Sequence, residues 1–176
     1  DWFMRPQSIL ILAFIVLYKL GDAMANSLTT PFLLNELALS LSEIGWLNKV
    51  LGIVATLLGA FLGGLLLSRM KLLRALMWFG VLQALSTLCY FALTLLENPG
   101  VMEVGVALFA EHLCSGMGTS AFVAFLMTVC NPQYAATQFA LLTALSAVGR
   151  VLSGPIAGYL VANEGWMVFF FISSVC

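Results

Sequence analysis

Charged residues are what this sequence lacks most. Asp, Glu, Lys and Arg make up 9% of its 176 residues, whereas an ordinary soluble domain has about 25%. Seven basic and eight acidic residues give a net charge of −1, so the chain has no basic surface for nucleic acid. With 62% hydrophobic residues, it cannot cover a soluble core with polar side chains. The composition excludes a soluble globular enzyme, a disordered segment and a nucleic-acid-binding protein. It predicts an integral membrane protein in contact with the lipid bilayer.

Motifs for catalysis and metal binding are absent as well. The sequence has no Gly-x-Ser-x-Gly, no His-Glu-x-x-His and no phosphate-binding loop, so we expect neither catalytic residues nor a bound metal. The four cysteines have no Cys-x-x-Cys spacing and are interpreted as packing thiols. No signal-peptide cleavage site follows the first apolar run. Because the chain begins at Asp1 and ends at Cys176 within an apolar run, we expect it to be part of a longer protein.

Apolar runs dominate the chain instead. A transmembrane helix needs about 20 mostly apolar residues, and turn-forming residues such as Asn131-Pro132 separate the runs. The pattern predicts an all-α membrane protein, a single six-helix bundle over residues 1–176. Its transmembrane helices are expected at residues 8–34, 43–67, 72–96, 102–130, 135–161 and 166–176, the last one truncated.

Basic residues gather on one side of the predicted bundle. Arg5 precedes the first helix, and Arg69, Lys71 and Arg74 lie between the second and third helices. The loops on the other side carry glutamates and no Lys or Arg. The positive-inside rule therefore predicts that the N-terminus of the chain faces the cytoplasm.

Five ionisable residues fall well inside the predicted helices: Lys19, Asp22, Lys49, Glu111 and Arg150. Each costs about 2.5–3.5 kcal/mol or more at the bilayer centre, which makes an intramembrane charge a functional hypothesis. Helical periodicity places Asn26 on the face of Lys19 and Asp22, and it gives Glu111 and Arg150 polar faces of their own. All of the five except Lys49 lie near one depth, at 1.5 Å of rise per residue. We predict one aqueous cavity shared by the first, fourth and fifth helices, as in a transporter.

Structural interpretations of the same charges stay open. Lys19 and Asp22 have the i, i+3 spacing of a structural pair. Glu111 has the depth to neutralise Arg150 across two helices. Lys49 lies nearer the outer end, where a lysine can extend to the membrane surface.

Small residues recur at helical spacing on two of the predicted helices. Gly52, Gly59 and Gly63 form one stripe on the second helix, and Gly154 and Gly158 form a Gly-x-x-x-Gly on the fifth. Such stripes let membrane helices approach closely. The sequence leaves open whether these glycines serve packing or gating.

Four runs of the sequence resemble the AmpG-type muropeptide permeases of the major facilitator superfamily. They are YKLGDAMANSLTTPFLL (18–34), EIGWLNK (43–49), GMGTSAFVAFLM (116–127) and ATQFALLTALSAVGR (136–150). The resemblance covers nearly the whole chain and matches the second half of such a permease. The cytoplasmic loop departs from the superfamily's pattern, because Ser68 stands at its Asp position and Lys71 at a Gly position.

This resemblance implies a fold and a function. The family has two six-helix bundles with the substrate path between them, so the partner of this chain would be an N-terminal six-helix half. The function implied is proton-driven import of anhydro-muropeptides (GlcNAc-anhydroMurNAc-peptides) across the bacterial inner membrane for peptidoglycan recycling, with no bound cofactor and an influence on β-lactamase induction. Asp22 is the first candidate for proton coupling or substrate contact, and the other candidates in the matched runs are Lys19, Lys49, Glu111, Gln138 and Arg150.

Two other functions remain open at this point. One is a related permease of the superfamily that carries a siderophore or another metabolite. The other is a structural six-helix membrane protein, in which the mid-membrane charges would pair with one another and leave no open cavity.

Overall fold

The computed structural model of the chain describes residues 8–35, 41–95 and 100–175, and every regular element in these ranges is helical. The elements are, in chain order, α1 (Ser8–Asn35), α2 (Leu41–Trp46), the π-helix η1 (Leu47–Leu51), α3 (Gly52–Leu67), α4 (Leu72–Thr94), α5 (Val101–Val129), the 3-10 helix η2 (Pro132–Tyr134) and α6 (Ala135–Val175). The predicted all-α class is confirmed. The predicted helix ends at residues 96 and 176 lie outside the described ranges.

Within the described ranges, five helical segments are long and apolar enough to cross a membrane. They are Ile9–Leu34, Ile44–Leu67, Leu72–Thr94, Val101–Val129 and Pro132–Ser174. The second segment joins α2, η1 and α3, because Trp46 and Gly52 at the junctions keep helical backbone angles. The first four segments lie close to the predicted spans.

Helix α6 contains a break that divides its long apolar segment. The apolar segment Pro132–Ser174, which joins η2 and α6, has 43 residues and would extend about 65 Å as one straight helix, roughly twice the thickness of the hydrocarbon core. Gly165 has φ 82° and ψ 173°, a conformation that residues with a Cβ rarely adopt. This break falls inside the predicted gap between residues 161 and 166. Beyond it, Phe170 packs on Phe32 of α1 with ring centroids 5.0 Å apart, so the part of α6 after Gly165 forms a separate short segment. The predicted division into six helices stays a prediction.

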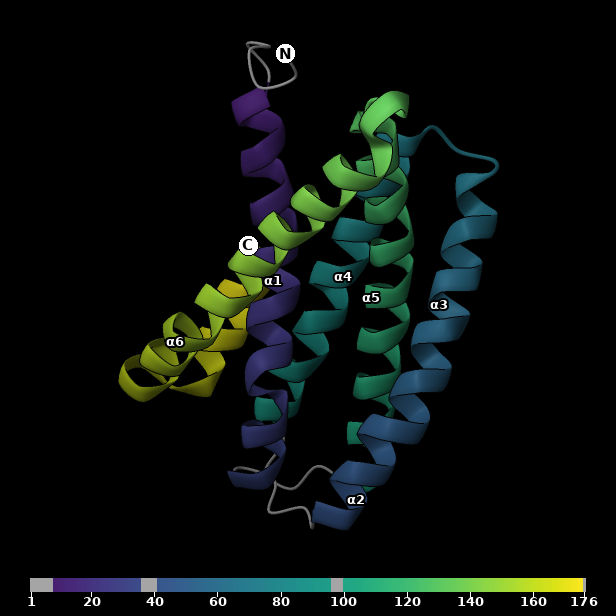
Figure 1. Cartoon of the computed structure of the whole chain (residues 1–176). Coiled ribbons are helices and arrows are strands. Elements are labelled where there is room, and N and C mark those ends of the chain that lie inside the picture. The colour runs from purple at the N-terminus through teal and green to yellow at the C-terminus, as the bar shows by residue number, and fades with distance from the viewer. Residues whose placement is uncertain (1–7, 36–40, 96–99, 176) are drawn as a thin grey trace.

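The helices pack side by side in a bundle (Figure 1). Helix α3 lies along α5, α1 lies along α6, and α4 contacts both α5 and α6. Apolar clusters hold α1 at both ends: Ile15 packs with Phe122 and Leu142, and Phe32 packs with Tyr90 and residues of the final segment. The middle of α1, between these clusters, carries its polar residues.

Glycine sets the distance between α3 and α5. A Cβ on Gly59 would meet the carbonyl oxygen of Leu113, and a Cβ on Gly116 would meet the carbonyl oxygen of Thr56. No side chain fits at either position, so the two backbones touch. Small residues allow such close approach between membrane helices.

The other predicted glycines differ in their surroundings. A Cβ on Gly52 would lie 2.9 Å from the His112 ring, and a Cβ on Gly63 would also meet α5. At Gly154 and Gly158, by contrast, no atom of the described chain lies within 4 Å of where a Cβ would stand. A gating role for any of these glycines stays a prediction.

Candidate functional site

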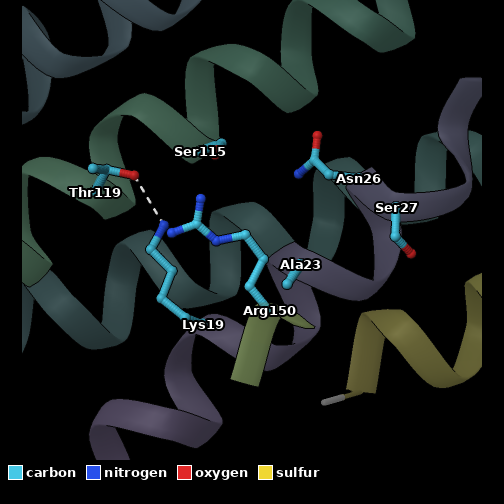
Figure 2. A pocket seen from close by; sticks show the side chains of 7 residues that line it. All are labelled: Lys19, Ala23, Asn26, Ser27, Ser115, Thr119 and Arg150. Atoms are coloured by element: carbon cyan, nitrogen blue, oxygen red, sulfur yellow. Dashed lines mark hydrogen bonds between the residues drawn. The ribbon is translucent and has the colours of Figure 1, made fainter. Parts of the chain in front are cut away.

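A cavity of about 520 Å³ lies between α1, α5 and α6. Figure 2 shows the side chains that line it: Lys19, Ala23, Asn26, Ser27, Ser115, Thr119 and Arg150. Two of these side chains are cations, one is an amide and three carry hydroxyl groups. None of the described residues that line the cavity is acidic. The described lining of the cavity is therefore polar and includes two cationic groups.

Helical periodicity brings the lining residues of α1 and α5 together. Lys19, Ala23 and Asn26 follow one another at intervals of four and three residues, so they share one face of α1. Ser115 and Thr119, four residues apart, share one face of α5 in the same way. The two faces meet across the cavity (Figure 2).

Lys19 is the lining residue with the most clearly defined contacts. Its Nζ donates a hydrogen bond to Oγ1 of Thr119, with 3.0 Å between the two atoms. The same Nζ lies 6.0 Å from the ring centroid of Phe122, at the outer limit of a cation–π interaction. Phe122 in turn stacks on Tyr18, with centroids 5.4 Å apart and an interplanar angle of 1°. These contacts fix the ammonium group on the α5 side of the cavity.

Arg150 reaches the cavity because α6 lies very close to α1. A Cβ on the adjacent Gly149 would stand 3.1 Å from the carbonyl oxygen of Val16. At this separation the Arg150 side chain extends past α1 into the cavity, as Figure 2 shows. The two cationic groups of the site thus come from different helices.

Glu111 lies against α4. Its side chain is 1% exposed, and its Oε2 accepts a hydrogen bond from Oγ of Ser86 at 2.6 Å and a longer one from Oγ1 of Thr87 at 3.5 Å. It is one helical turn from Ser115 but does not itself line the cavity. The two hydroxyl groups hold the Glu111 side chain against α4. A role of Glu111 in the transport pathway stays a prediction.

The remaining predicted residues lie apart from one another. Asp22 belongs to α1, but its side chain lies outside the part of the chain that the structure describes. Lys49 is exposed on η1, and π-helical turns of this kind are frequent at functional sites. Gln138 lies near the start of α6, where its Oε1 accepts a hydrogen bond from the backbone N–H of Asn131 at 2.7 Å. Of the seven predicted pathway residues, the structure brings together Lys19, Asn26 and Arg150.

Sequence reasoning did not single out Ser27 or Gly149. Ser27 donates to the carbonyl oxygen of Met24 in its own helix, and serines commonly do so, which makes a lone serine a weak signal. Gly149 directly precedes the intramembrane Arg150, and this position could have indicated that α6 approaches another helix closely there.

Several membrane-length helices around a polar cavity form the arrangement of a solute transporter. The sequence profile of the Major Facilitator Superfamily matches residues 11–176. The chain belongs to this superfamily.

Its similarity to individual proteins is more specific. It is 53% identical to the anhydromuropeptide permease of Escherichia coli K12 over 98% of its own length and 35% of that protein. It is also 32% identical to putative transporter AmpG 1 of Rickettsia prowazekii, over 95% of this chain and 37% of the relative. It is 33% identical to putative transporter AmpG 4 of Rickettsia conorii, over 99% of this chain and 42% of that relative. The chain thus spans between one third and one half of the length of these relatives. Their names describe permeases and transporters rather than enzymes, and the predicted AmpG-type resemblance is confirmed.

Proposed function

We propose that the chain is the C-terminal six-helix half of a proton-coupled permease that imports anhydro-muropeptides for peptidoglycan recycling. The polar cavity between α1, α5 and α6 carries this proposal, because a water-filled, charged site in a membrane bundle suits a solute pathway. The name of the E. coli relative supports the cargo. Lys19 and Arg150, two of the intramembrane charges, line this cavity, and such charges commonly mark a solute pathway.

The proposal includes a second bundle and an orientation. The relatives are more than twice as long as this chain, which leaves room for an N-terminal half that completes the pathway. Arg69, Lys71 and Arg74 are exposed at the connection between α3 and α4, and the positive-inside rule favours the cytoplasm for that end. The N-terminal end of α1 lies at the same end of the bundle (Figure 1). The membrane would be the bacterial inner membrane.

Some of these residues would bind the cargo, and others would couple its transport to proton movement. Lys19, Asn26 and Arg150 would contact the cargo in the cavity. Asp22 and Glu111 are the two intramembrane carboxylates, and a carboxylate that gains and loses a proton is the usual element of proton coupling. The exposed Lys49 and the half-buried Gln138 lie on other parts of the bundle. They are proposed as contacts along the route to and from the cavity.

An uptake assay in a host that lacks its own muropeptide permease tests the transport proposal. The full-length protein should accumulate labelled anhydro-muropeptide, and a protonophore should abolish the accumulation. Unlabelled anhydro-muropeptide should compete, whereas a siderophore should not. Competition by the siderophore alone would favour a related permease with another cargo.

Asp22→Asn tests the coupling role. The variant should still insert into the membrane. Its proton-driven uptake should fall at least about tenfold, because an amide cannot bind and release a proton as a carboxylate does. The matched control is Glu103→Gln, since Glu103 is an exposed carboxylate in the first turn of α5. Normal uptake by Asp22→Asn would remove this residue from the mechanism and leave the transport proposal in place.

A further inference from the structure

We infer that the connection between α3 and α4 binds the headgroup of an anionic phospholipid, and that Arg69, Lys71 and Arg74 contact its phosphate. The three side chains are exposed and close together in the sequence. In the orientation proposed above, the lipid belongs to the cytoplasmic leaflet. The inference adds a lipid ligand to the transporter and does not depend on which cargo is carried.

The packing of neighbouring residues keeps these cations at the surface. Met70 and Leu72 pack against an apolar cluster formed by α4 and α5. Arg69 and Lys71 alternate with them in the sequence and are exposed. The backbone is held as well, because the N–H of Arg69 donates to the carbonyl oxygen of Leu66 at 3.0 Å. The cations are therefore attached to an ordered part of the bundle.

The positive charge at this end of the bundle is not balanced by acidic residues of the chain. The start of α1 and the connection between α5 and α6 lie at the same end (Figure 1), and residues 130–138 contain no charged residue. Residues 1–7, which lie outside the described ranges, add one acidic and one basic residue and so leave the excess of positive charge unchanged. Among the described exposed acids, Glu103 stands in the first turn of α5, at the other end. The phosphate of an anionic lipid can supply the missing negative charge.

Helix α4 offers a surface for the rest of the lipid. Arg74, Trp78, Val81 and Leu85 follow one another at intervals of four, three and four residues, so they share one face, and all four are exposed. Tryptophan is enriched where the hydrocarbon meets the headgroups. Leu85 lies about 16 Å along the helix from Arg74, which is about half the thickness of the hydrocarbon core. Cation, indole and alkyl groups thus have the same order as the phosphate, interface and acyl chains of one leaflet.

Native mass spectrometry of the delipidated full-length permease tests this inference with two lipids that have the same acyl chains. Phosphatidylglycerol carries a negative charge, whereas phosphatidylcholine has no net charge. The wild type should bind phosphatidylglycerol at least about tenfold more tightly, because each cation near the membrane surface attracts an anionic lipid. Arg69→Gln, Lys71→Gln and Arg74→Gln should each reduce this preference by about two- to fivefold, and the triple variant should lose it.

Matched variants separate the position of the cations from charge in general. Lys49→Gln removes an exposed cation of η1, at the opposite end of α3, and should leave the lipid preference unchanged. Arg69→Lys and Arg74→Lys keep the charge and should retain most of the preference. Thermal unfolding in detergent shows whether each variant is folded when its lipid binding is measured.

Two results would overturn the inference. One is equal binding of the two lipids by the folded wild type, and the other is a loss of preference in Lys49→Gln as large as the loss in the triple variant. The binding assay contains no muropeptide, so its failure would leave the proposed transport function in place. A failure of the uptake assay would in turn leave the measured lipid preference unaffected.

Discussion

Two neighbouring residues of α5 face two very different environments. Gly116 is buried against α3, where a Cβ would meet the backbone of Thr56. Ser115, the preceding residue, lines the polar cavity. One step along a helix turns the side chain by about 100°, so Gly116 faces α3 while Ser115 faces the cavity. The side of α5 that packs on α3 needs a small residue, and the side that lines the cavity carries polar residues.

The largest expected effect comes from filling the packed side. Gly116→Leu would force a side chain into the backbone of α3, because a Cβ alone would already stand 3.0 Å from the Ala60 nitrogen. Overpacking of this kind costs about 1–3 kcal/mol or more. We expect a clear drop in the unfolding temperature of the full-length protein in detergent and little protein in the membrane.

Ser115→Leu is the matched control for this substitution. The same side chain would enter an open cavity of about 520 Å³, so the unfolding temperature should change much less, while muropeptide uptake is blocked. Equal destabilisation by the two variants would show that Ser115 is packed as tightly as Gly116. The proposed difference between the two sides of α5 would then be wrong.

An intermediate effect is expected at Glu111, one helical turn before Ser115, where α5 contacts α4. Glu111→Ala removes the hydrogen bond from Ser86 and leaves a buried void, and the cost of these losses is about 1–3 kcal/mol. Glu111→Gln should cost less, because its amide oxygen accepts the same hydroxyl bond. Thermal unfolding measures both variants against Glu103→Ala at an exposed position of the same helix. If Glu111→Ala is no less stable than that control, the contact with α4 does not stabilise the bundle.

Much of the bundle and the core of the candidate site follow from the sequence. Runs of about 20 apolar residues define the long helices, and Gly165 breaks the last one in the predicted gap. Depth and direction along a helix follow from 1.5 Å and about 100° per residue. For this reason Lys19 and Arg150, on two distant segments, could be expected in one cavity.

The position of Glu111 could not be predicted in the same way. Periodicity gives it nearly the same direction as Ser115, since four residues turn a helix by about 400°. The remaining offset is enough to turn its carboxylate toward Ser86. Tertiary packing decides which neighbouring helix covers each part of α5. The residue pattern of one helix does not predict its packing partners.

The smallest effects should come from the glycines of α6. No described atom lies within 4 Å of a Cβ at Gly154 or Gly158, so an added methyl group meets open space. Gly154→Ala and Gly158→Ala should each change the free energy of unfolding by about 0.5 kcal/mol or less, with any gain arising from the better helix propensity of alanine. Thermal unfolding of the full-length protein beside Gly116→Ala is the direct measurement, because the same methyl group is then added to a packed and to an open glycine. A loss at α6 as large as the loss at Gly116 would mean that another segment packs there as closely as α3 packs on α5. In that case the face of α6 with Gly154 and Gly158 would be a packed interface in the full-length protein. The stripe on α6 would then not differ from the stripe of Gly52, Gly59 and Gly63, which packs on α5.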